Sequence, residues 1–179
     1  MYIVQRCVIV YVLINSINTP SPGFKLGPNK VYFRASSARV TWQQAKENCI
    51  ADGGRLAVLD SPELNRFVIQ RWPKGELKSS RVWIGGFLSE NRVWKWIDGS
   101  EFGYENWEEV GDHADGNNNN NNNNNGCLTL DLAKGVWTRR PCRGLPLPDG
   151  AATRKFPFLC EYAAVNACFI AKIRFDDFP

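Results

Sequence analysis

The chain has 179 residues and a formal net charge of +4 at pH 7. That length corresponds to one domain with short extensions, and hydrophobic residues, 44% of the total, are sufficient for a buried core. A charge this small gives no reason to expect nucleic acid as a partner.

Residues 1–19 have the pattern of a secretory signal peptide. Arg6 supplies a positive charge before the apolar run from Cys7 to Ile14, and polar residues follow. The run is too short for a membrane span, which needs about 20 residues. The alternative is a buried N-terminal strand. A signal peptide predicts a secreted, extracellular protein whose cysteines pair in an oxidising compartment.

Residues 20–29 hold three prolines and two glycines, which predict a linker without β-sheet pairing. We expect the main domain over residues 30–162, beginning with a strand from Lys30 to Ala35. A C-terminal tail over residues 163–179 follows, and its alternating apolar pattern would also fit an added edge strand.

Two helices are predicted after the first strand. Thr41 can cap the first helix, Gln44 completes a capping box, and Gly53-Gly54 ends it. Pro62 stands in the first turn of the second helix, where proline is tolerated. The apolar faces consist of Trp42, Ala45 and Cys49 in the first helix and Leu64, Phe67 and Val68 in the second.

Short strands are predicted between the two helices and after them. They are predicted over Leu56 to Leu59, Val82 to Phe87, Val93 to Ile97, Cys127 to Leu132 and Phe158 to Tyr162. Lys134-Gly135 is typical of a hairpin turn that leads into Trp137. Helices first and strands later predict an α+β domain.

A series of cysteines, tryptophans and glycines runs through these elements. In chain order it comprises Trp42, Cys49, Gly53-Gly54-Arg55-Leu56, Trp83-Ile84-Gly85-Gly86, Trp94-Lys95-Trp96, Asp98-Gly99-Ser100, Asn106-Trp107, Cys127, Trp137, Cys142 and Phe158-Leu159-Cys160-Glu161. In this order the motifs resemble the C-type lectin-like domain, in its short form with two internal disulfides. The resemblance implies two helices, small antiparallel sheets, a long irregular loop region, and pairing between the two ends of the domain.

The same resemblance implies disulfides between Cys49 and Cys160 and between Cys127 and Cys142. If Cys7 leaves with the signal peptide, five cysteines remain, and Cys168 has no partner within the chain. Cys168 could form a disulfide-linked dimer, stay a free thiol, or belong to an extension that is not native sequence.

Sugar-binding members of the family hold calcium with oxygen ligands near the positions that match Trp107, Cys127 and Trp137. An Asn-Asp pair normally follows the last tryptophan, but here Thr138 and Arg139 follow it. A guanidinium has no acceptor atom and cannot ligate a cation. The segment after Trp107 also lacks the usual Glu-Pro-Asn or Gln-Pro-Asp triplet. We therefore expect the calcium site to be absent, with no metal and no cofactor.

A replacement calcium site is a weaker alternative. It would combine Asp112 and Asp115 with the nine asparagines at 117–125. A uniform asparagine tract is typical of a solvated insertion, and ordering it would reduce any affinity gained.

Five basic residues stand close to Cys142 in the sequence or in the implied fold: Arg139, Arg140, Arg143, Arg154 and Lys155. They predict a basic patch that binds an anionic glycan or an acidic protein surface. Alternatively they form a solvated face, balanced by acidic residues of the neighbouring loop such as Glu105 and Glu108.

No catalytic constellation is evident. His113 is the only histidine, and no serine or cysteine nucleophile has a plausible base, so we expect no enzyme. The prediction is a secreted recognition module that binds carbohydrate or another extracellular ligand without calcium. The alternative is a structural or protein-binding extracellular component that binds no sugar, and a calcium-dependent lectin with unusual ligands ranks last.

Overall fold

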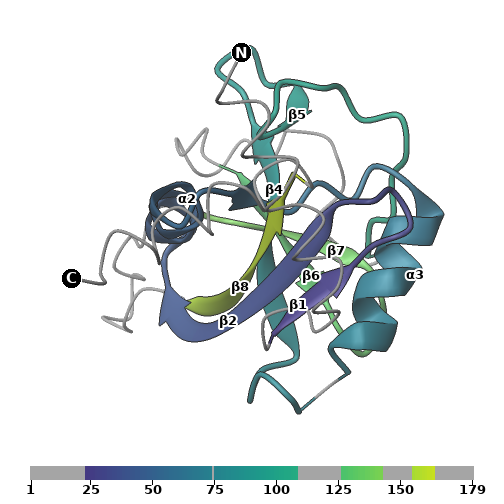
Figure 1. Ribbon diagram of the computed structural model, residues 1–179. Helices are drawn as coiled ribbons and strands as arrows, with labels where there is room; N and C mark the ends of the chain where they lie inside the picture. The colour runs from purple at the N-terminus through teal and green to yellow at the C-terminus, as the bar shows by residue number, and fades with distance from the viewer. Residues whose placement is uncertain (1–22, 74, 109–125, 143–154, 164–179) are drawn as a thin grey trace, which may run out of the picture.

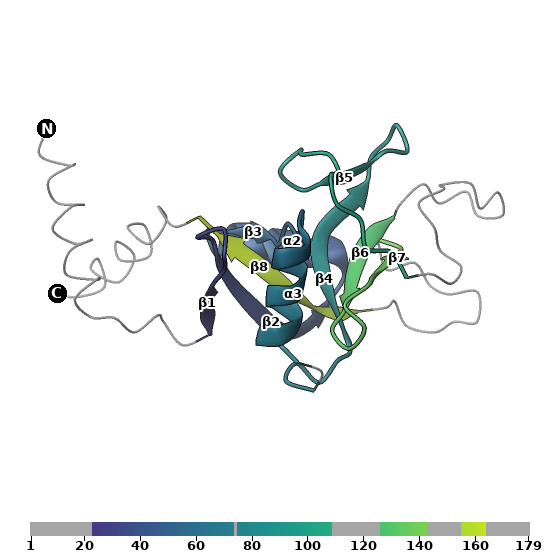
Figure 2. The same cartoon turned by 90° about the vertical axis from the view of Figure 1, so that its right-hand side faces the viewer.

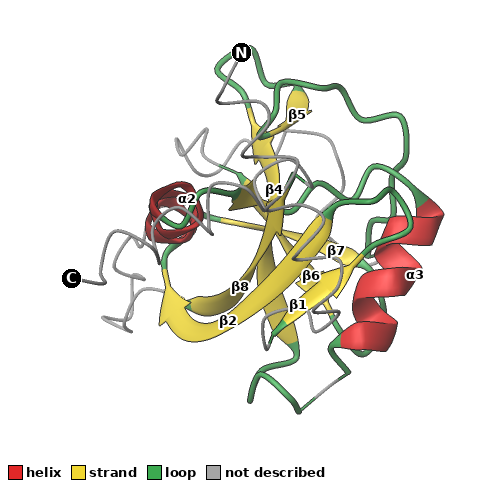
Figure 3. Ribbon diagram, in the orientation of Figure 1, coloured by secondary structure: helices red, strands yellow, loops and turns green. Residues whose placement is uncertain are grey.

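The computed structural model describes residues 23–73, 75–108, 126–142 and 155–163. In it, two helices pack against opposite faces of a mixed β-sheet (Figures 1 and 3). The helices are α2 (Trp42–Ala51) and α3 (Pro62–Arg71). The strands are β1 (Phe24–Leu26), β2 (Tyr32–Val40), β3 (Arg55–Leu56), β4 (Arg81–Leu88), β5 (Trp94–Trp96), β6 (Cys127–Asp131), β7 (Trp137–Arg140) and β8 (Phe156–Tyr162).

The order of the strands confirms the α+β class. It is β1-β2-β8-β4-β6-β7, with β3 paired to β8 and β5 paired to β4. β2 and β8 are antiparallel, with Phe33 opposite Glu161, so the two ends of the domain pair as expected. β4 runs parallel to β8, and Trp83 of β4 lies opposite Phe158 of β8. Because β4 links β8 to β6, the described strands form one connected sheet rather than the separate small antiparallel sheets that were expected.

The central strands are apolar on both sides because each face of the sheet carries a helix. Along β4, Val82 and Ile84 face the core cluster that contains residues of α3. Trp83, between them, faces the cluster that contains residues of α2. Successive side chains of a strand point to opposite faces, and a strand buried on both faces therefore has a continuous apolar run.

The predicted helix signals are present. Thr41 and Gln44 form the capping box of α2, and Gly53 follows its end with a φ of 81°. Ser61 caps α3, with Pro62 in its first turn. The expected strand from Leu56 to Leu59 is shorter than predicted, because β3 ends at Leu56. Ala57 still donates its N–H to the Leu159 carbonyl of β8, and it is buried together with the next two residues outside any strand.

The prediction of a linker without pairing is wrong for β1. Phe24 to Leu26 pairs with β2, Leu26 lying opposite Tyr32. β1 is at the end of the strand order, and Pro22 and Pro28 lie outside its three residues, so no proline removes a donor from the pairing. Lys25 fixes the strand by donating to the Arg71 carbonyl, 2.5 Å away, at the end of α3.

Both expected disulfides are present, which confirms the short form with two bridges. Cys49–Cys160 joins α2 to β8, and Cys127–Cys142 joins β6 to the residues after β7. The close approach of β4 to β6 explains Gly86, where a Cβ would lie 2.5 Å from Leu128 Cδ1. Several predicted features lie outside the described residues. They are the signal peptide, the asparagine tract with Asp112, His113 and Asp115, the basic residues Arg143 and Arg154, and the tail with Cys168.

Candidate functional site

The β6–β7 hairpin lies at one end of the strand order, and its strand β7 contains Thr138 and Arg139 (Figure 2). The Asp131 carboxylate accepts hydrogen bonds from the backbone N–H groups of Ala133 and Lys134, at 2.9 and 3.1 Å. Gly135 takes the positive φ of 77° that the turn requires. The turn predicted at Lys134-Gly135 is therefore confirmed.

The segment around Trp107 runs along the outer edge of β7. The Trp137 N–H donates to the Asn106 carbonyl at 2.7 Å, and the Glu108 N–H donates to the Trp137 carbonyl at 2.9 Å. These two bonds place the Glu108 side chain next to Thr138.

A buried asparagine joins α3 to this hairpin. Asn65 is 4% exposed. Its Oδ1 accepts from Trp137 Nε1 at 2.9 Å, and its Nδ2 donates to the Gly135 carbonyl at 2.7 Å. The same carbonyl also accepts from Asn106 Nδ2 at 2.7 Å. The sequence interpretation missed Asn65, and the only signal was its position on the helix face of Leu64 and Val68.

The Glu108 carboxylate is bound by protein donors through both oxygens. Thr138 Oγ1 donates to Oε2 at 3.1 Å, and Lys134 Nζ donates to Oε1 at 2.5 Å. Arg81 Nη2 lies 3.8 Å from Oε2. The hydrogen bond from Lys134, followed by that from Thr138, lowers the pKa of Glu108, and the Glu108 carboxylate raises the pKa of Lys134. The carboxylate beside Thr138 is thus already neutralised by a protein cation.

Arg139 and Arg140 are both half-buried, opposite Leu128 and Cys127 of β6. Adjacent residues of a strand point to opposite faces, so the two side chains do not share one face. Arg139 lies across Gly126, where a Cβ would be 2.8 Å from Arg139 Nε and 3.0 Å from Trp94 Cη2. Gly126 therefore allows the Arg139 side chain to lie close to the Trp94 ring.

Trp94 packs against two further aromatic rings. The centroid of Trp94 lies 5.0 Å from that of Trp107 and 6.1 Å from that of Phe102. Trp107 and Phe102 are half-buried, so parts of both rings reach the surface. Arg139 approaches this aromatic cluster at Trp94, which is itself buried at 7% exposure.

Lys155 lies apart from the two arginines. It is exposed and immediately precedes β8, whose Phe158 lies opposite Trp83 near the beginning of β4. Arg140 lies opposite Cys127, which in turn lies opposite Phe87 near the end of β4. The strand register thus places Lys155 and Arg140 at opposite ends of β4.

The described residues contain no group of three or more histidine, cysteine, aspartate or glutamate side chains placed to hold a metal ion. Over the same ranges, no helix has the length and apolar character needed to cross a membrane.

The sequence of this domain matches a known protein family. The family model of the lectin C-type domain matches residues 38–162. The chain is 32% identical over 130 residues to C-type lectin 1 of Hydrophis hardwickii, covering 69% of this chain and 68% of that protein. It is 32% identical over 96 residues to ladderlectin of Oncorhynchus mykiss, covering 53% of this chain and only half, 50%, of that relative.

Among solved structures, a calcium-independent type II antifreeze protein superposes with a TM-score of 0.60. Its identity to this chain is 22%, and the match covers 81% of this chain and 95% of that one. At this identity the likeness shows the fold alone.

Proposed function

The chain belongs to the C-type lectin domain family, and on that premise we propose that it is a secreted, non-catalytic recognition module that binds an anionic carbohydrate without calcium. Its candidate contacts are Arg139 and Arg140 on β7, with Arg143, Arg154 and Lys155 as further basic candidates. Lys155 would act separately from the two arginines, because it lies at the other end of β4.

The observation that carries the proposal is the engagement of Glu108 by Lys134. A calcium ion needs six to eight oxygen ligands, most effectively carboxylates. The Glu108 oxygens already accept from Lys134 and Thr138. A calcium ion entering here would meet the positive charges of Lys134 and Arg81 at close range, which opposes its binding. The cationic side chains take the place of the metal, so the ligand would be bound by the protein directly.

Arg139 supports an anionic ligand at this edge. Its planar guanidinium can donate two parallel hydrogen bonds to a sulfate or carboxylate group. The half-buried rings of Trp107 and Phe102, which pack with Trp94, would offer an apolar surface for the C–H face of a sugar ring. Together these groups recognise an acidic or sulfated sugar better than a simple inorganic anion.

Secretion is supported by two independent features. Residues 1–19 have the pattern of a signal peptide. The domain also contains two disulfides, which persist in oxidising compartments and are rare in the cytosol.

The test is binding of the full chain to immobilised heparin, with elution by salt, in the presence of a chelator. Arg139→Gln should weaken binding by about tenfold, since a charged hydrogen bond contributes about 1.5 kcal/mol or more. Lys30→Asn is the matched control, because it removes one positive charge from an exposed turn with a φ of 61° that asparagine also adopts. Equal elution of both variants, or binding that requires calcium, would refute the proposal.

The alternative function is a protein-binding component that acts as a disulfide-linked dimer through Cys168. It rests on the odd number of cysteines that remains after removal of a signal peptide. Non-reducing gel electrophoresis of the secreted protein and of a Cys168→Ser variant decides it. A dimer band lost in the variant supports this function, and a monomer band from the unmodified protein contradicts it.

A further inference from the structure

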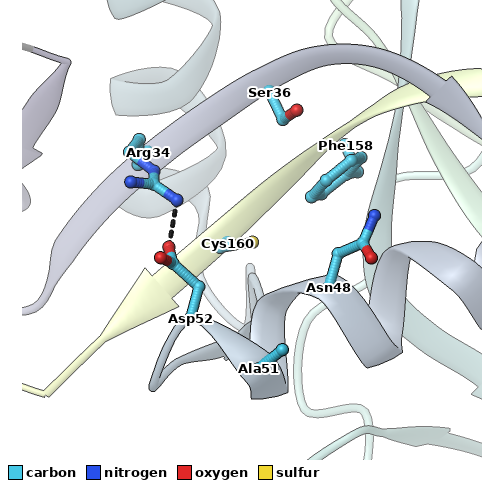
Figure 4. A pocket seen from close by; sticks show the side chains of 7 residues that line it. All are labelled: Arg34, Ser36, Asn48, Ala51, Asp52, Phe158 and Cys160. Atoms are coloured by element: carbon cyan, nitrogen blue, oxygen red, sulfur yellow. Dashed lines mark hydrogen bonds and ion pairs between the residues drawn. The ribbon is translucent and has the colours of Figure 1, made fainter.

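A groove of about 330 Å³ lies between α2, β2 and β8, on the α2 face of the sheet (Figure 4). It is lined by Arg34 and Ser36 from β2, Asn48, Ala51 and Asp52 from α2 and its cap, and Phe158 and Cys160 from β8. Its size is at the lower end of the range for small-molecule sites in proteins. We propose that this groove binds a neutral, hydroxyl-rich ligand of the size of one sugar unit, independently of the β7 edge.

The charged end of the groove is fixed in place by aromatic neighbours. The Arg34 guanidinium forms an ion pair with the Asp52 carboxylate. It lies over the rings of Phe24 and Tyr162, 5.0 and 5.6 Å from their centroids. Tyr162 also donates its hydroxyl proton to Asp52 at 2.5 Å. Because these contacts hold both charged groups before any ligand arrives, little conformational entropy is lost on binding.

The ion pair selects the charge class of the ligand. One positive and one negative group face the groove together, so neither an anion nor a cation gains a net attraction. About 37% of the Arg34 side chain and 41% of the Asp52 side chain remain exposed, which leaves both able to make further hydrogen bonds. Each hydroxyl group can donate to the carboxylate and accept from the guanidinium. A vicinal diol therefore satisfies both groups at once.

The opposite end of the groove supplies polar groups of the same kind. Asn48 extends from α2 toward Phe158, and Ser36 lies across from it on β2 (Figure 4). The Asn48 side chain is exposed, so its amide can donate and accept. The Ser36 hydroxyl accepts from the Ala38 N–H at 3.3 Å and still has its own proton to donate.

The floor between these two ends is apolar. It consists of Phe158 and Cys160 of β8, and Ala51 adds an apolar side chain beside Asp52 at the end of α2 (Figure 4). Polar groups at both ends of a short apolar floor match a sugar ring, which has hydroxyls on its rim and C–H groups on its face.

The experiment is a titration of the ¹⁵N-labelled full chain with the methyl glycosides of glucose, galactose and N-acetylglucosamine, followed by NMR. At least one glycoside should produce saturable shifts of the Asn48 side-chain amide and of the Asp52 backbone N–H. Asn48→Ala should weaken that binding by about fivefold, which corresponds to one hydrogen bond. Ala51→Leu, an exposed helix position, should abolish it by filling the groove.

Gln43→Ala is the matched control, because Gln43 is exposed on the same helix and does not line the groove. Gln43→Ala should bind the glycoside as tightly as the unmodified chain does. Arg139→Gln should also bind it as tightly, which would show that the groove acts independently of Arg139 on β7. The absence of shifts with every glycoside, shifts that survive Ala51→Leu, or saturable shifts with sodium sulfate instead would each overturn the proposal.

Discussion

Replacing Asn65 with leucine should destabilise the domain and loosen the β6–β7 hairpin. Asn65 is 4% exposed and is the hydrogen-bond acceptor for Trp137 Nε1, which belongs to a fully buried ring. Leucine has a similar shape but no acceptor, so the buried indole N–H loses its partner. An unsatisfied buried donor costs about 1–3 kcal/mol. The Gly135 carbonyl is less affected, because Asn106 still donates to it.

We therefore expect Asn65→Leu to lower the free energy of unfolding by about 2 kcal/mol, and Asn106→Ala to lower it by less than about 1 kcal/mol. The double variant should lose about 1 kcal/mol more than the sum, because only then is the Gly135 carbonyl left without a side-chain donor. Urea unfolding of the oxidised chain measures all three values. For a chain of this length, 2 kcal/mol corresponds to a fall in Tm of about 4–8 °C.

Gln70→Leu, at an exposed position of α3, is the control and should change stability by less than about 0.5 kcal/mol. If Asn65→Leu behaves like this control, or if the double variant is simply additive, the role assigned to Asn65 is refuted.

Three further predictions follow from the same geometry. First, the Tm of the full chain should be the same in millimolar calcium and in chelator, because Lys134 already neutralises Glu108; a calcium-dependent rise of several degrees would contradict this. Second, burial raises the pKa of Glu161, although hydrogen bonds from Val58 and Arg55 oppose the rise. The unfolded chain then releases this proton at a lower pH than the folded chain does, so the contribution of Glu161 to stability falls as pH increases above about 4.3. Glu161→Gln should remove that part of the pH dependence in urea unfolding above about pH 4.3, and an unchanged slope would contradict it. Third, replacing Cys127 and Cys142 together by alanine should lower stability by about 3 kcal/mol, since the bridge spans 15 residues, whereas loss of the 111-residue Cys49–Cys160 bridge should lower it by about 4.7 kcal/mol. Equal losses in thermal unfolding would argue against this loop-length explanation.

Local signals account for the parts of the fold that were predicted correctly. The capping box of Thr41 and Gln44, the proline in the first turn of α3 and the glycine at the hairpin turn each act within a few residues. Such contacts depend on the chain near the residue concerned, and the sequence states them directly. The order of the motifs then identified the family, which the matching family model confirms.

The candidate site was only partly predictable for the same reason. The sequence predicted that Thr138 and Arg139 stand where sugar-binding members of the family have calcium ligands, because both positions follow directly from Trp137. It did not show that Lys134 neutralises Glu108, 26 residues away, since that contact requires the Trp107 segment to lie along β7. It also grouped Lys155 with Arg139 and Arg140, whereas strand register places Lys155 at the other end of β4.

The sequence by itself determined the family and the helix ends. Only the tertiary structure decided the pairing of β1, the buried role of Asn65, the neutralisation of Glu108 and the groove between α2 and β2. Each of these depends on which strands are neighbours and in what register they pair. Register is fixed by the packing of both sheet faces at once, and no short stretch of sequence contains that information.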